Sequence, residues 1–217
     1  MFNLPSSPFD RLFNRPRPVW ITVILCFLLI GSPPAAAFLD GIWSDYIQQG
    51  FWRISLVAPA EIIYILVIAP ILARSDENVI EVFRARTSLD NESFDQLVYN
   101  SARSNPAVET ATIIGGALLG LITAYSWGLS SNAVWLSITL YILLGMMYAL
   151  LAWVIMGAIV GTRFMSALHR QPLHFDLFDI KPFEPIGKQS LTVAMVFIGV
   201  ISVGVIFSVQ GQTFLNP

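Results

Sequence analysis

A single glutamate, Glu61, lies in the middle of the apolar segment ISLVAPAEIIYILVIAP, which begins at Ile54. If that segment crosses a membrane, Glu61 lies roughly 10 Å below its start. A charged side chain at the centre of a bilayer costs roughly 3 kcal/mol on insertion scales. Glu61 must therefore be protonated, reach water, or find a polar partner such as Tyr64, one turn later, or Arg53, about 12 Å away on the same face. This intramembrane group predicts a proton or cation relay, or a hydrogen-bonded polar anchor between helices.

A second group of titratable side chains lies in residues 161–189, where three prolines prevent one continuous helix. An enzyme acting on lipids at the membrane surface is one use for this group, and half of a metal site around His174 is another. The spacing matches no zinc signature, and no cysteine lies nearby. We therefore predict no metal site and no cofactor. The polar candidates in this interfacial segment are His169, Arg170, His174, Asp176, Asp179 and Lys181.

Composition places these residues in a membrane protein. The 217-residue chain is 55% hydrophobic and only 12% charged, whereas soluble domains carry about 25% charged residues. A hydrocarbon core about 30 Å thick needs roughly 20 apolar residues of helix. Several segments qualify, which predicts an all-α polytopic transmembrane helical bundle of about five spans. The expected spans are about 19–39, 54–73, 110–129, 133–160 and 190–209, in a single domain of residues 19–217 after a cytoplasmic segment of residues 1–18.

The basic residues predict the orientation of the chain. If the amino terminus is cytoplasmic, Arg53 is the only Lys or Arg on the outer side, as the positive-inside rule requires. We therefore expect a plasma-membrane protein with its carboxyl terminus outside and with residues 74–109 and 161–189 in the cytoplasm. The net charge of −2 gives no support for nucleic-acid binding, so the lipid bilayer is the expected environment.

The first predicted span has an alternative interpretation as a cleaved signal peptide. Three arginines precede a short apolar run, and the small-residue stretch SPPAAAF follows that run. The leader is long, however, and apolar character resumes at Phe38 and Leu39. We therefore favour a retained span.

Residues 74–109 predict a short amphipathic helix between the second and third spans. Asp90 or Asn91 is a suitable N-cap, and Asn105 with Pro106 marks the start of the third span. The helix serves either as a docking surface for a partner protein or as a linker on the lipid or the bundle, and we favour the linker. Its apolar face is expected to hold Phe94, Leu97, Val98 and Ala102.

Two pairs of glycines predict close helix packing. Gly116 and Gly120 form a GxxxG motif in the third span, and Gly157 and Gly161 form another at the end of the fourth. Small residues allow the close backbone contacts that hold helices together in lipid. We expect both motifs to pack within the chain, with a homo-oligomer or hetero-oligomer interface as the alternative.

The stretch LHRQPLHFDLFDIKPFEPIGKQSL, together with VIAPILAR at the end of the second span, resembles a group of multi-pass bacterial integral membrane proteins with no known activity. The resemblance covers most of the chain and implies only fold and location. Members of that group continue into a further helix after the fifth span. If the resemblance holds over the whole chain, we expect the chain to be a shorter version or a fragment.

The residue types inside the predicted spans exclude several functions that membrane proteins perform. No histidine or lysine lies in any predicted span, which excludes intramembrane bis-histidine haem ligation, a Schiff base and a Ser–His protease pair for a lone chain. We therefore predict no catalytic residues and expect a non-enzymatic membrane anchor or subunit of a larger complex, with a protein partner bound through residues 74–109 and 161–189. The alternatives are a small proton- or ion-coupled transporter using Glu61 and an interfacial lipid-active enzyme.

Overall fold

The computed structural model describes residues 18–84, 87, 89–102, 105–127, 133–169 and 184–208. Within these residues, five helices are long and apolar enough to cross a membrane. The protein is thus an all-α polytopic helical bundle, as predicted. The spans are built from α2 (Val19–Leu39), α4 (Phe51–Ser55) with α5 (Val57–Arg84), α7 (Pro106–Ser126), α8 (Val134–His169) and α9 (Glu184–Ser208).

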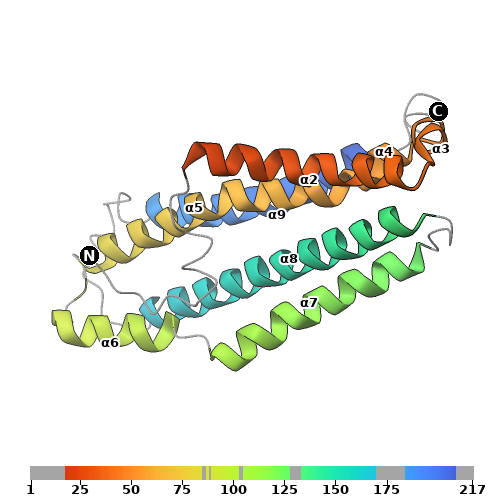
Figure 1. Cartoon of the computed structure of the whole chain (residues 1–217). Helices are drawn as coiled ribbons and strands as arrows, with labels where there is room; N and C mark the ends of the chain where they lie inside the picture. The colour runs from red at the N-terminus through yellow and green to blue at the C-terminus, as the bar shows by residue number, and fades with distance from the viewer. Residues whose placement is uncertain are drawn as a thin grey trace, which may run out of the picture.

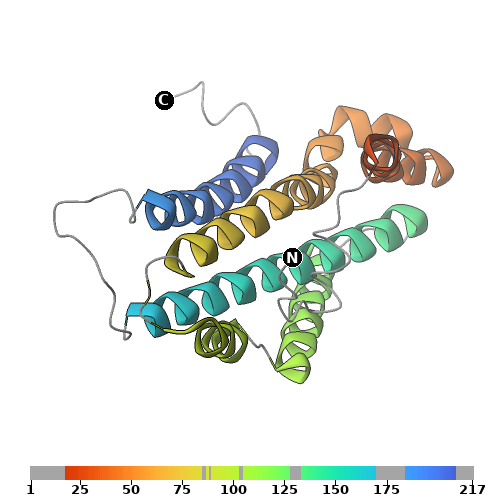
Figure 2. The same ribbon diagram turned by 90° about the vertical axis from the view of Figure 1, so that its left-hand side faces the viewer.

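The spans form two layers, with α2, α5 and α9 in one and α7 and α8 in the other (Figure 1). Two short helices, α3 (Trp43–Gln48) and α6 (Asn91–Ala102), lie at opposite ends, which we name the α3 end and the α6 end. Helix α5 lies between α9 and α8 (Figure 2) and contacts both, whereas α7 packs on α8. The main apolar core is centred on Ile62 and Ile65 of α5, Leu144 and Met147 of α8, and Val196 of α9.

Three helices continue past the ends that the sequence predicted for their spans. Helix α5 runs through Pro70 to Arg84, α8 continues to His169, and α9 already begins at Glu184. The predicted spans ended with their apolar runs, but apolar residues recur at helical spacing beyond the predicted ends of α5 and α8. Val79 and Phe83 of α5 and Phe164 of α8 are buried in a shared cluster, which stabilises these two extensions.

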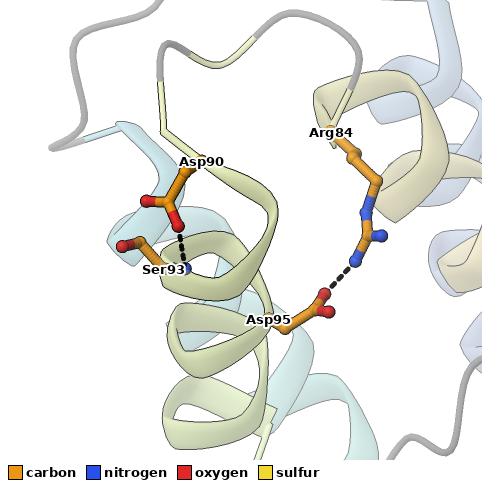
Figure 3. A network of polar contacts seen from close by, with 4 residues as sticks. All are labelled: Arg84, Asp90, Ser93 and Asp95. Atoms are coloured by element: carbon orange, nitrogen blue, oxygen red, sulfur yellow. Dashed lines mark hydrogen bonds and ion pairs between the residues drawn. The ribbon is translucent and has the colours of Figure 1, made fainter.

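Helix α6 packs onto these extensions. Its residues Phe94 and Val98 point inward, as predicted, and the α6-end cluster consists of Val79, Ile80, Phe83, Phe94, Val98 and Phe164. Asp90 caps the helix by accepting a hydrogen bond from the Ser93 N–H at 3.3 Å (Figure 3). The Ser93 side chain, and after it the Ser93 N–H, lower the pKa of the Asp90 carboxyl. An ion pair between Arg84 and Asp95 also joins α5 to α6. Helix α6 is therefore fixed to the bundle by apolar and polar contacts.

At the α3 end, a carboxylate that follows α2 binds the first turn of α8. Asp40, directly after α2, accepts hydrogen bonds from the N–H groups of Trp135 at 3.0 Å and Leu136 at 2.8 Å. These N–H groups belong to the first turn of α8, which has no carbonyl of its own to bind them. The carboxylate also lies at the positive end of the α8 dipole. Asp40 therefore caps α8 and fixes it to α2.

Replacing Asp40 with alanine is expected to lower the free energy of unfolding by about 2 kcal/mol, the upper range for loss of a helix cap. Asp40→Asn keeps an acceptor oxygen but loses the charge, so its loss should be smaller. Thermal unfolding of the purified wild type and variants in detergent measures the loss of stability in Asp40→Ala and in Asp40→Asn. Asp45→Ala, which removes an exposed acid of α3, is the control. Equal melting temperatures for the Asp40 and Asp45 variants would contradict the capping role.

The α7–α8 contact depends on the first GxxxG pair. A Cβ atom placed on Gly116 would lie 2.6 Å from the Tyr148 carbonyl oxygen, and one on Gly120 would lie 2.8 Å from the Gly145 Cα. Both distances are shorter than any normal contact, so the two backbones meet where the glycines leave space. Helix α7 starts at Pro106, with the Asn105 side chain accepting a hydrogen bond from the Ala107 N–H, as predicted.

Candidate functional site

Glu61 lies in the second turn of α5, where this helix packs on α9. A break at Leu56 separates α4 from α5 and places Pro59 in the first turn of α5, where a missing N–H costs little. The Glu61 side chain is only 6% exposed. A Cβ atom on Gly204 of α9 would lie 3.0 Å from Glu61 Oε1, so the glycine provides the space that the carboxylate occupies.

Tyr64 lies one turn after Glu61, and its side chain takes part in the contact between α5 and α9. Its hydroxyl donates to the Met195 carbonyl oxygen at 2.9 Å, which joins α5 to α9. Its ring fits over Gly199, where a Cβ atom would overlap the Tyr64 hydroxyl. The sequence had offered Tyr64 as a donor to Glu61, and the structure instead gives the hydroxyl a backbone acceptor.

Arg53 does not join this site. Its guanidinium carbon lies 5.1 Å from the centre of the Trp52 ring, and its side chain is exposed. Within the described part of the chain, no hydrogen bond or ion pair reaches the Glu61 carboxylate, and its oxygen atoms keep a little exposure. The structure thus places Glu61 and Tyr64 at the contact of α5 with α9, and the Glu61 carboxylate lies beside Gly204.

The interfacial candidates fall largely outside the described residues. His169 is the last residue of α8, while Arg170, His174, Asp176, Asp179 and Lys181 lie in residues 170–183, which the structure does not describe. Elsewhere, among the described residues, no group of three His, Cys, Asp or Glu side chains lies close enough together to hold a metal ion. A lipid-active enzyme built on these histidines therefore gains no geometric support.

The α6 end presents a second candidate site, which we name the α6 platform and define as residues 77–84 and 91–102. The buried face of α6 covers the α6-end cluster, and its other face is polar and exposed. Four exposed acids lie on the two helices α5 and α6, and only Asp95 among them has an ion-pair partner in the described chain. These acids are Glu77, Glu81, Glu92 and Asp95.

The second GxxxG pair lies apart from the first. A Cβ atom on Gly157 would meet nothing within 4 Å, and one on Gly161 would approach only the Gln189 side chain of α9, at 3.8 Å. Both glycines line an open groove between α8 and α9. The sequence had predicted intrachain packing for this pair, and the structure places it where the two helices separate.

Comparison with protein-family models, with curated proteins and with solved structures gives no match to this chain. The chemistry of these residues therefore carries the functional inference.

The sequence did not lead us to predict two features of the structure. Asp40 follows the first span directly and does not cap α3, which begins at Trp43, so its neighbours in the sequence did not indicate its partner on α8. The acids of the α6 platform were treated as part of a linker, although their separation from the Phe94 and Val98 face already indicated an outward surface.

Proposed function

We propose that the protein is a non-enzymatic, membrane-embedded subunit or anchor of a larger complex, and that the α6 platform binds its partner. The observation that supports this most directly is the burial of Phe94 against Phe83 and Phe164. A linker needs only to connect two spans. This segment instead forms a capped helix fixed to two long helices, which holds its polar face in one position.

The charge of the platform indicates the chemistry of the partner. Glu77, Glu81 and Glu92 are exposed on neighbouring helices, and Arg84 is paired with Asp95. Like charges gathered on one surface favour a partner of the opposite sign and repel others. We therefore expect the partner to present a basic surface.

The same proposal includes the orientation of the chain in a plasma membrane. Arg74, Arg84, Arg163 and Lys188 belong to the helix segments at the α6 end, whereas Arg53 belongs to the α3 end. The positive-inside rule then places the α6 platform and the amino terminus in the cytoplasm. The basic partner is accordingly a cytoplasmic protein or the cytoplasmic part of another membrane protein.

Site-specific photocrosslinking in cells tests the platform. A photoreactive residue at Gln96, on the exposed face of α6, should give one discrete product with a second protein. The same group at Ile122, 63% exposed on α7, is the control and should give none. Reversing charge with Glu81→Lys and Glu92→Lys together should reduce the Gln96 product several-fold. Absence of a product at Gln96, or a product unchanged by charge reversal, would contradict the proposal.

Glu61 supports a second candidate function, a proton-coupled pathway along the α5–α9 contact. The supporting observation is a buried carboxyl group to which the described residues provide no hydrogen bond or ion pair. Such intramembrane acids commonly mark proton or ion pathways. Gly204 gives this carboxyl group its place against α9, since a Cβ atom there would lie 3.0 Å from Glu61 Oε1.

Glu61→Gln is expected to abolish proton-coupled flux in proteoliposomes, because glutamine has the same shape but cannot release a proton. Its melting temperature should match that of the wild type. Glu77→Gln, an exposed acid on the same helix, is the control and should leave flux intact. Undiminished flux in the Glu61 variant, or no flux in the wild-type protein, would remove this candidate.

A further inference from the structure

A groove of about 450 Å³ separates α8 from α9, and α5 forms its floor. The two helices that flank it make little direct contact with each other. Small residues create the space, because Ala69 and Ala73 form the floor and Gly157 and Gly161 line the wall from α8. The volume lies within the usual range for sites that bind small molecules.

The groove is apolar along most of its length and polar toward the α6 end. Val193, Val196 and Phe197 of α9 line the apolar part. Gln189, only 8% exposed, lies toward the α6 end and points its amide toward Gly161 of α8. Thr162 and Ser190 also line the groove.

Each of the three lining helices carries an exposed cation next to a lining residue at this end. Arg74 follows Ala73 on α5, Arg163 follows Thr162 on α8, and Lys188 precedes Gln189 on α9. Three acids lie nearby in sequence. Glu184 is paired with Lys188 at 2.7 Å, and Asp76 and Glu77 follow Ala73 by about one turn. The Glu184–Lys188 pair is exposed on both sides and is therefore weak. Among the described residues, Arg74 and Arg163 form no ion pair.

We propose that this groove binds one phospholipid with an anionic headgroup. An acyl chain lies between α8 and α9 on the small residues of α5 and α8. The phosphate lies toward Gln189 and Ser190, within reach of Arg74, Arg163 and Lys188. Basic residues between helices at the cytoplasmic side of a membrane are the usual recognition element for such headgroups.

A transmembrane helix of another protein fits the groove less well than a lipid. Gln189 reaches from α9 toward α8 and narrows the groove toward the α6 end. A helix would have to pass this side chain and cover the adjoining cations, whereas a lipid ends there with a headgroup of complementary charge. This site is separate from the α6 platform, and its test does not depend on a protein partner.

Titration of the delipidated protein in detergent tests the proposal, with bound lipids counted by native mass spectrometry. Phosphatidylglycerol and phosphatidylcholine with identical acyl chains are the two probes. The wild-type protein should bind one phosphatidylglycerol at least about tenfold more tightly than phosphatidylcholine. Arg74→Gln with Lys188→Gln should weaken the binding of phosphatidylglycerol about fivefold for each cation removed. The binding of phosphatidylcholine should be unchanged. Arg53→Gln, at the α3 end, is the control and should change neither.

Gly157→Leu tests the position of the acyl chain. Since a Cβ atom on Gly157 meets nothing within 4 Å, the leucine should fill the groove without disturbing the fold. Binding of both lipids should fall while the melting temperature is maintained. Equal binding of the two lipids by the wild type, a preference unchanged in the double variant, or full binding in Gly157→Leu would overturn the proposal. A second protein that co-purifies with the wild type and is lost in Gly157→Leu would also overturn it, by assigning the groove to a helix.

Discussion

Replacing Phe94 with alanine is expected to detach α6 from the bundle. The Phe94 side chain is fully buried in the α6-end cluster, and the Arg84 guanidinium carbon lies 5.2 Å from the centre of its ring. Truncation of a buried phenylalanine costs about 3–5 kcal/mol. Because α6 covers this cluster, the loss should appear as local opening of α6 while the spans stay folded.

Hydrogen exchange and limited proteolysis of residues 91–102 in the detergent-purified protein measure this opening. Both should increase strongly in Phe94→Ala and stay at wild-type levels in Asn100→Ala, which shortens an exposed side chain of the same helix. The Gln96 photocrosslink should disappear in Phe94→Ala, since a detached α6 no longer holds its polar face in place. Protection of α6 equal to that of the wild type would show that the cluster does not hold the helix.

Replacing Gly120 with alanine is expected to force α7 away from α8. The added Cβ atom would lie 2.7 Å from the Leu144 carbonyl carbon and 2.8 Å from the Gly145 Cα, and both are backbone atoms that no rotamer change can move. Overpacking of this kind costs about 1–3 kcal/mol, and a purely backbone obstacle places Gly120→Ala at the upper end. The change should therefore lower the melting temperature markedly.

Gly115 offers a matched control in the same helix. A Cβ atom there meets nothing within 4 Å, and alanine is a better helix former than glycine, so Gly115→Ala should be neutral or stabilising. Thermal unfolding of the two variants side by side separates packing from helix propensity. Equal melting temperatures would mean that α7 and α8 do not meet at Gly120.

The sequence alone determined the features that depend on neighbouring residues. An apolar run of sufficient length predicted each span, because the bilayer imposes that length on any crossing helix. The starts of α6 and α7 followed from Asp90, Asn105 and Pro106, since a cap acts within one turn of its own helix. The inward face of α6 followed from the spacing of Phe94 and Val98.

Only the tertiary structure decided which surfaces meet. A span is apolar on every face, so its hydrophobic pattern does not show which side contacts protein and which contacts lipid. Gly116–Gly120 and Gly157–Gly161 are equivalent motifs in the sequence, yet one pair lies against a helix and the other lines a groove. The partners of Asp40 and Tyr64 lie 95 and more residues away in the chain, and their hydrogen bonds exist because the packing of α2 with α8 and of α5 with α9 brings them together.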